Sequence, residues 1–296
     1  MPAHDVNDVD SIGGRVALRY EEGKDLTVDA SLVGQRIDGS DSQYAERDLG
    51  DLERAAAYPQ PFRNDFLLTD IVVRKSWDDV DMTTSVGYAH QVMDEAFEGI
   101  ALTDIQNAAN EPVFGAPMVR FGQSQRIDML TAELKFSHSN PNGTGWLVAA
   151  SFLHNTSNVT RETGRPGYMR PLTGFENRIW EATVFGETTF SPLDHLNVSV
   201  GGRVSHSNLA GKAQDPVLPS REYDLDPGAR ASRTETIFLP SLAVAYQPSS
   251  ALTLFARFQK GFRPGGIAVR REYIEGYQSD RVQAFEAGFR LRQERF

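Results

Sequence analysis

The chain has 296 residues, of which 40% are hydrophobic and 24% charged, and its mean hydropathy is −0.40. Its net charge of −10 argues against a nucleic-acid partner, because phosphate binding needs clustered lysine and arginine, and the sequence has no such cluster. The absence of cysteine excludes a disulfide scaffold, a cysteine-ligated zinc site and a thiol nucleophile.

The N-terminal part of the chain predicts strands at residues 16–20, 26–36 and 66–77. In the second of these, apolar and polar side chains alternate with a period of two, which places them on opposite faces of a strand. The apolar face consists of Leu26, Val28, Ala30 and Leu32, and the other face of Thr27, Asp29, Ser31, Val33 and Gln35.

The same alternation continues to the end of the chain and gives roughly eleven strands in all. Further predicted strands cover residues 82–92, 130–137, 146–152, 180–190, 196–205, 238–246, 252–259 and 283–291. Charged residues lie inside these strands, opposite the apolar face, which suits a water-filled or plugged interior better than a dry core. This inward-facing set is Asp29, Glu133, Lys135, Glu181, Glu187, Arg203, Arg257, Glu286 and Arg290.

The connections alternate between short turns and long polar segments. The short ones are residues 21–25, 78–81, 139–145, 191–195 and 247–251, and the long ones are 38–64, 94–125, 157–175, 207–234 and 265–281. In an up-and-down antiparallel sheet, all short turns then lie at one end and all long loops at the other. Short periplasmic turns with long extracellular loops are typical of an outer-membrane β-barrel.

Aromatic residues support a membrane-spanning barrel. Five of them flank the short turns on the apolar face, as an interfacial girdle would: Tyr20, Trp77, Trp146, Phe190 and Tyr246. Nowhere do about 18 consecutive apolar residues offer a spanning helix, so any membrane contact would be made by strands. A secreted soluble β-sandwich that binds glycans also alternates, and it stays an alternative at this point.

The sequence shows no pattern of an enzyme, a cofactor site or a metal site. It lacks the spacings of a serine-nucleophile elbow, a phosphate-binding loop and a helical zinc motif. Of the six histidines, His90, His154 and His206 fall on the apolar face near loop ends, where we interpret them as interfacial polar residues. No residue can be assigned to ligand binding.

One stretch, FARFQKGFRPGGI at residues 255–267, begins as a strand and ends in a sharp corner. Pro264 suits the first central position of a turn and Gly265 the second, so we expect a type II turn with positive φ at Gly265.

This corner resembles a feature of TonB-dependent outer-membrane receptors. Residues 239–266, LPSLAVAYQPSSALTLFARFQKGFRPGG, are similar to the family's strand, short turn, strand and corner, and FEAGFR at 285–290 is similar to its next strand. The family-signature positions, to which we assign a structural role, are Gly261, Phe262, Arg263, Pro264, Gly265, Gly266, Glu286 and Gly288.

The resemblance implies a 22-stranded barrel with an N-terminal plug, which imports siderophores, cobalamin or carbohydrates across the Gram-negative outer membrane with energy from the TonB complex. We therefore expect residues 1–296 to be an internal barrel segment, in contact with outer-membrane lipid. Its plug and TonB contact would lie in a missing N-terminal region of the parent protein. Phe296 lies out of phase with the apolar row of Phe285, Phe289 and Leu291, which favours truncation. A passive porin-like channel is the alternative in the same compartment.

Overall fold

A computed structural model of the chain describes residues 4–42, 44–47, 49–100, 118–172, 174–214, 230–269 and 274–292, and these residues form strands, turns and loops without a helix. Eleven strands form one path: β1 (Val9–Glu22), β2 (Leu26–Gly39), β3 (Phe62–Trp77), β4 (Val80–Ile100), β5 (Met118–Ser139), β6 (Gly145–Arg165), β8 (Gly174–Leu193), β9 (Leu196–Gln214), β10 (Arg230–Ser249), β11 (Leu252–Arg263) and β14 (Asp280–Leu291). Three short strands are added: β7 (Tyr168–Pro171), which pairs with β6, and β12 (Gly266–Val269) and β13 (Ile274–Tyr277), which form a separate hairpin.

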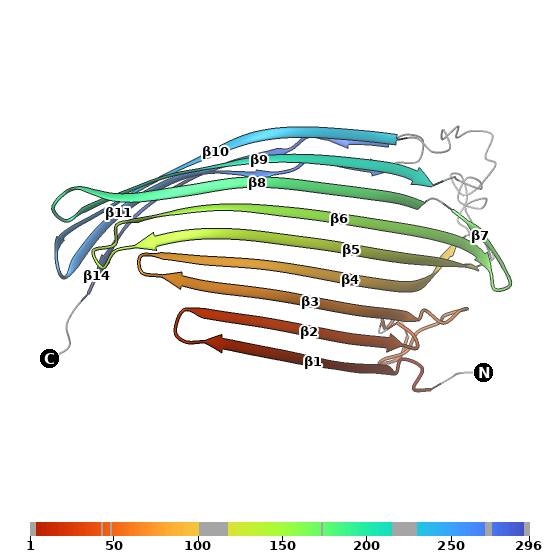
Figure 1. Cartoon of the computed structure of the whole chain (residues 1–296). Helices are drawn as coiled ribbons and strands as arrows, with labels where there is room; N and C mark the ends of the chain where they lie inside the picture. The colour runs from red at the N-terminus through yellow and green to blue at the C-terminus, as the bar shows by residue number, and fades with distance from the viewer. Residues whose placement is uncertain are drawn as a thin grey trace.

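Every strand of the path pairs antiparallel with the next one along the chain, and the sheet arches in a single layer (Figure 1). The prediction of an all-β, up-and-down antiparallel sheet is therefore confirmed. A β-sandwich would need two sheets packed face to face, so the soluble sandwich alternative is wrong. None of the described residues belongs to a helix that is long and apolar enough to span a membrane.

The strands reach much further into the loop end of the sheet than the sequence indicated. Residues 157–175, predicted as a long loop, are largely the end of β6, a tight turn, β7 and the start of β8. Gly167 has a φ of 86° in that turn, directly after Pro166. The predicted loop 94–125 likewise contains the end of β4 and the start of β5, and residues 101–117 lie outside the described residues. The outer face of these extensions is mostly polar, as at Asp94, Arg120 and Thr160, so their sequence lacks the alternation that reveals the lower parts of the same strands.

One face of the sheet, which we call the outer face, carries large exposed apolar side chains. The unbroken register between β4 and β9 places Val86, Leu130, Phe152, Val184 and Val204 on it, each 38–58% exposed. The five predicted girdle aromatics lie on the same face beside the short turns and are 40–57% exposed. Exposed apolar area on this scale is unfavourable in water and suits contact with lipid acyl chains.

The opposite, inner face is polar and more closely packed. Thr183 and Ser205, each 2% exposed, share a hydrogen bond of 2.8 Å between their hydroxyl oxygens. All the predicted inward-facing charges from Asp29 to Arg290 lie on this face according to the strand register. Pairing of the two buried hydroxyls removes the cost of leaving either one unsatisfied.

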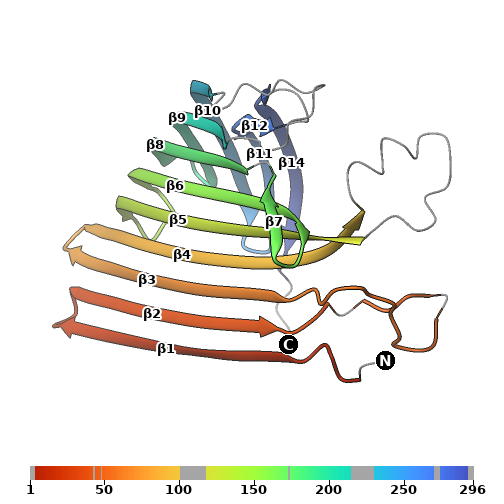
Figure 2. The ribbon, with the colours of Figure 1, turned by 90° about the vertical axis from the view of Figure 1, so that its right-hand side faces the viewer.

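The sheet does not close. β1 and β14 form its two edges, and the arch stays open between them (Figure 2). Because the path contains eleven alternating strands, β1 and β14 run in the same direction, from the loop end to the turn end. Direct pairing of these two edges would be parallel. An all-antiparallel barrel that contains this sheet therefore needs an odd number of further strands between them.

We expect the 296-residue chain, produced alone in aqueous buffer, to aggregate. Its two long edges expose unpaired backbone groups and its outer face exposes a broad apolar band, so association with other copies lowers the free energy. Size-exclusion chromatography with light scattering measures this. A monodisperse, heat-stable monomer without detergent would contradict both the open sheet and its contact with lipid.

Candidate functional site

The turn-side part of the inner face carries hydrogen-bonded ion pairs between strands. Asp29 on β2 accepts from Arg19 on β1, with 2.6 Å between Nε and Oδ1, and from Arg74 on β3, with 2.5 Å between Nη1 and Oδ2. The partly buried carboxylate is thus held between two guanidinium groups. This arrangement links three strands through charge-assisted hydrogen bonds.

A second charged region lies farther along the same face. Arg203 on β9 pairs with Glu181 on β8 at 3.2 Å and also donates to Ser205 at 3.1 Å. The two acceptors belong to neighbouring strands, so the guanidinium group joins them. A pocket of about 560 Å³ opens beside this pair, and its charged lining residues are Glu181, Glu187, Arg203, Arg257 and Lys260.

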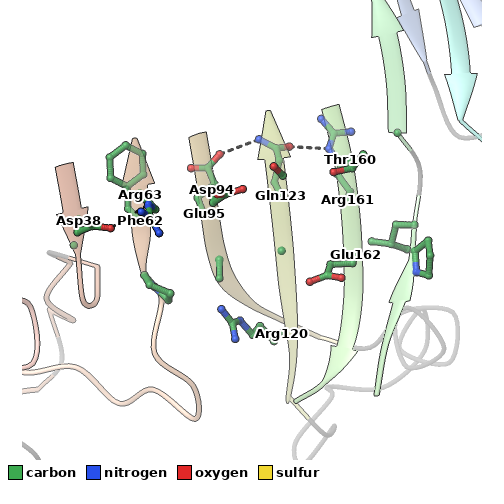
Figure 3. Close-up of a pocket in the computed structure, with 18 residues that line it drawn as sticks. Asp38, Phe62, Arg63, Asp94, Glu95, Arg120, Gln123, Thr160, Arg161 and Glu162 are labelled. Carbon is green, nitrogen blue, oxygen red and sulfur yellow. Dashed lines mark hydrogen bonds and ion pairs between the residues drawn. The ribbon is translucent and has the colours of Figure 1, made fainter. Parts of the chain in front are cut away.

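The loop-side part of the inner face has a different chemistry, built mainly from amides. Gln123 on β5 donates from Nε2 to Glu95 Oε1 on β4 and accepts at Oε1 from Arg161 Nε on β6, each at 2.8 Å. Figure 3 shows these three side chains joined across the strands. Gln91 on β4 similarly donates to Asn64 on β3 at 2.8 Å.

The Glu95–Gln123–Arg161 chain borders a pocket of about 740 Å³ at the loop end of the sheet (Figure 3). The pocket is lined from both faces of the strand ends. Phe62, Glu95, Gln123 and Arg161 belong to the inner face, and the charged residues in phase with the outer face are Arg63, Asp94, Arg120 and Glu162. Arg161 also lies over the Phe175 ring, 5.7 Å from its centroid, which adds a cation–π contact to its hydrogen bond. The Arg161 guanidinium group is therefore positioned by both Gln123 and Phe175.

The loop between β2 and β3 is organised around Asp41. Its Oδ1 accepts from the backbone N–H groups of Ser42 and Gln60, both at 2.8 Å, and from Arg54 Nη2 at 2.7 Å. The Asp41 and Arg54 side chains are 9% and 13% exposed. Burial raises the pKa of Asp41, but the two N–H donors and the guanidinium group outweigh burial and hold this pKa below its usual range.

The outer face turns polar where the apolar band ends. Asp128 on β5 accepts from Tyr88 Oη at 2.6 Å and lies 2.7 Å from His90 Nδ1, both on β4. His206 packs on Trp180 with 5.3 Å between ring centroids. The register places His90, His154 and His206 on the outer face as predicted, and in the described part of the chain no three His, Asp or Glu side chains are grouped to hold a metal ion.

The predicted signature residues lie on β11, β14 and the connection that follows β11. Gly261, Phe262 and Arg263 pair with Val282, Arg281 and Asp280, and the Arg263 guanidinium group forms an ion pair with the Asp280 carboxylate. Glu286 lies opposite Arg257, and Gly288 lies opposite Phe255.

Gly288 is explained by close packing. A Cβ atom at this position would lie 2.7 Å from Cζ of the Phe255 ring, which is below van der Waals contact. Glycine thus lets the aromatic ring lie across the neighbouring strand. At Gly261, in contrast, the nearest atom to an added Cβ is 3.8 Å away, in Val282, which is an ordinary contact.

The corner at Pro264 and Gly265 differs from the expected type II turn. Among the described glycines, those with positive φ are Gly23, Gly143, Gly164 and Gly167, so the prediction for Gly265 is wrong. The chain instead continues through Pro264 and Gly265 into β12, and Gly266 pairs with Tyr277 of β13.

The hairpin that follows the corner folds across the sheet. β12 contacts β9 and β13 contacts β10, although β10 and not β9 is the neighbour of β11 (Figure 2). The inner-face residues Ser207, Leu209 and Ile237 of β9 and β10 are only 7–8% exposed. The corner therefore directs the chain towards the inner side of the sheet.

Sequence reasoning missed the amide-rich part of the inner face. Asn64 and Gln123 fell within predicted loops, so their side chains had no assigned direction. The recurrence of glutamine at alternate positions, as at Gln123 and Gln125, is the signal that was available.

The sequence was compared with known protein families. The family described as TonB dependent receptor-like, beta-barrel, matches residues 7–296. No curated protein sequence matches the chain.

The fold is similar to that of solved outer-membrane proteins. The ferric yersiniabactin uptake receptor FyuA from Yersinia pestis superposes with a TM-score of 0.72 at 12% identity, over 96% of this chain and 43% of that one. The ferric citrate transporter FecA gives 0.71 at 12% identity, over 97% and 41%. The siderophore receptor PiuA from Acinetobacter baumannii gives 0.66 at 9% identity, over 97% and 48%. This chain thus spans less than half the length of each.

We expect Gly288→Ala to destabilise an assembled barrel that contains this chain by about 1–3 kcal/mol, because the new methyl group overlaps the Phe255 ring. Urea titration in detergent, followed by the heat-modifiable band on semi-native gels, measures the loss. Gly261→Ala on the adjacent strand is the matched control, with a change below about 1 kcal/mol expected. Equal effects of the two substitutions would contradict the packing explanation.

We expect Asp41→Asn to loosen the β2–β3 loop and to raise the rate of tryptic cleavage at Arg47 and Arg54 by about tenfold at pH 8, because Arg54 loses its charged partner. Since the pKa of Asp41 is lowered, its stabilising effect is complete above about pH 4 and is lost as the pH falls through the folded-state pKa. Hydrogen exchange between pH 2 and pH 6 measures this second effect. Asp51→Asn, at an exposed position of the same loop, should change neither measurement.

Proposed function

The chain belongs to the TonB-dependent receptor β-barrel family, and on this basis we propose that it forms part of an outer-membrane receptor that imports a scarce ligand with energy transduced by TonB. Members of this family are transporters and not enzymes. The observation that carries the proposal is the contrast between the two faces of one sheet, with exposed apolar side chains outside and ion pairs and amides inside. A sheet of this kind separates lipid from a polar lumen.

The chain would act as a segment of a longer barrel. It spans less than half of the solved receptors that it resembles, and its two edge strands run in the same direction. We propose that further strands of the parent protein close the barrel. An N-terminal plug and a TonB-contacting segment of the parent would complete the transporter, so the segment alone would not transport.

The two inner regions suggest a division of roles within the receptor. The ion-paired turn-side region, including Arg19, Asp29 and Arg74, would face the plug, because fixed charges in a wet interior can exchange partners with another protein surface. The loop-side amides and the ordered β2–β3 loop would meet the ligand first. The Asp41 contacts support this role, since they hold that loop in one arrangement.

Deletion of the complete parent gene tests the proposal. We expect slower growth when iron, cobalamin or one carbon source is limiting, and we expect deletion of tonB to give the same defect without an additive effect. The protein should fractionate with outer membranes. Growth that depends on the gene but not on TonB would identify a passive channel instead, and recovery of the protein in the soluble fraction would contradict its location.

A further inference from the structure

The wall of the sheet divides between β10 and β11. These two strands pair from Ser241 with Gln259 to the short turn, and among the described residues no pairing joins them beyond Ser241. The same register, continued, would place residues 237–240 opposite residues 260–263. On their other sides β10 stays paired with β9, and β11 with β14, throughout this loop-side part. We call the space between residues 237–240 and 260–263 the lateral window.

Pro240 marks the point where the pairing of β10 with β11 ends. Proline has no backbone N–H group to donate, so within a sheet it belongs at an edge or an irregularity. Pro240 lies opposite Gly202 on β9, and a Cβ atom at Gly202 would lie 2.8 Å from Cε2 of the Phe238 ring. The Phe238 ring therefore leans towards β9 and away from β11.

Side-chain contacts close the lateral window at its loop end. Glu235 on β10 accepts a hydrogen bond of 2.9 Å from Ser279 Oγ and lies 3.7 Å from the Arg281 guanidinium group on β14. The hairpin β12–β13 contacts β9 and β10 but forms its own two-stranded sheet, so it adds no strand to either side of the window. The window is thus bounded at both ends and spans about 13 Å of strand.

The pocket of about 560 Å³ beside Arg203 and Glu181 also reaches the lateral window. Its lining residues at the window are Leu239, Pro240, Lys260, Gly261 and Phe262. Arg203 and Glu181 pair at 3.2 Å, which leaves Glu187, Arg257 and Lys260 as the other charged lining residues and a net charge of one positive. A volume of this size accommodates a small polar group.

Two exposed cations flank the lateral window. The register places Lys260 on the outer face of β11 and Arg257 on its inner face. Glu286 lies opposite Arg257, but within the described part of the chain neither cation is in an ion pair. Both side chains are therefore available to a negatively charged group in the window.

The lateral window begins at the depth of the apolar band. On β10 the apolar outer face continues through Leu242 and Pro240 to Phe238, which is 62% exposed, and on β11 it ends at Phe258. Backbone N–H and C=O groups that no neighbouring strand satisfies cannot face hydrocarbon without a large cost. A polar group must therefore occupy the window, directly beside surface that contacts acyl chains.

We propose that the lateral window holds the headgroup of one anionic lipid from the surrounding leaflet. The phosphate lies between Lys260 and Arg257, and its oxygens accept hydrogen bonds from unpaired backbone N–H groups of the window. The acyl chains lie along Phe238 and Phe258 on the outer face. A zwitterionic lipid brings a positive charge of its own beside the two cations, so it fits less well. This site goes beyond the proposed transport function and requires only that the barrel lies in a membrane.

Native mass spectrometry of the complete, delipidated parent receptor in detergent tests the proposal, with phosphatidylglycerol as the anionic probe and phosphatidylcholine as the zwitterionic one. We expect one phosphatidylglycerol to stay bound, with at least fivefold preference over phosphatidylcholine. Lys260→Gln should lower its occupancy about fivefold, because one cation beside the phosphate is lost. Lys75→Gln, at an outer-facing lysine near the short turn after β3, is the matched control and should leave occupancy unchanged.

Three outcomes of this measurement would overturn the proposal. They are equal retention of the two lipids, retention of neither lipid, and equal effects of the two lysine substitutions. The heat-modifiable band of each variant confirms that its barrel is assembled.

Pairs of cysteines test the lateral window itself, in a parent receptor without other cysteines. Phe238→Cys with Phe262→Cys spans the window, and Val244→Cys with Ala256→Cys spans the paired part of the same two strands on the same face. A short thiol-specific crosslinker bridges the roughly 5 Å between Cβ atoms of paired residues, so it should join the control pair. We expect at least tenfold less crosslinking of the window pair. Equal crosslinking would show a continuous ladder and would overturn the proposal.

These measurements involve neither uptake nor TonB. Equal retention of the two lipids would contradict the lipid site and leave the transport proposal standing. Uptake that does not depend on TonB would contradict the transport proposal and leave the lipid site standing.

Discussion

Backbone hydrogen bonding between neighbouring strands is the constraint on which this structure depends. Inside a lipid bilayer no water can satisfy the backbone N–H and C=O groups, so each strand must pair on both sides. Nine of the eleven strands in the path satisfy this requirement within the chain, and β1 and β14 do not. The outer apolar band, the polar lumen and the arrangement of loops all follow from a single continuous layer in which side chains alternate between the two faces.

The alternation also determines how much the sequence could predict. Where one face meets lipid, as at Trp146, Val148 and Phe152 on β6, apolar and polar side chains alternate clearly. In these parts of the chain the strands, their direction and their lipid-facing side were all predicted. Beyond Ser157 the same strand is polar on both faces, and the signal disappears although the hydrogen bonding continues to Arg165. Asn64 and Gln123 lie in such polar strand ends, so both residues were visible in the sequence while their common face was not.

The corner at Pro264 and Gly265 shows a different limit of prediction from sequence. The resemblance located a junction at Pro264 and Gly265 and identified Gly288, but local turn rules gave the wrong conformation for Gly265. Those rules consider four residues, whereas the path of this segment reflects β12 packing towards β9 and an ion pair between Arg263 and Asp280. The reason for Gly288 is likewise an aromatic ring on another strand, which no local pattern contains.

The common direction of β1 and β14 limits how such a barrel can be rearranged by duplication or engineering. If two copies of this segment were joined end to end, β14 of one copy would lie beside β1 of the other. Both strands run from the loop end to the turn end, so no short turn could connect them and they could not pair antiparallel. Addition or removal of whole hairpins keeps the alternation intact, because each hairpin contributes one strand in each direction. A barrel of this type can therefore change its diameter in steps of two strands, but it cannot be built by repeating a unit of eleven.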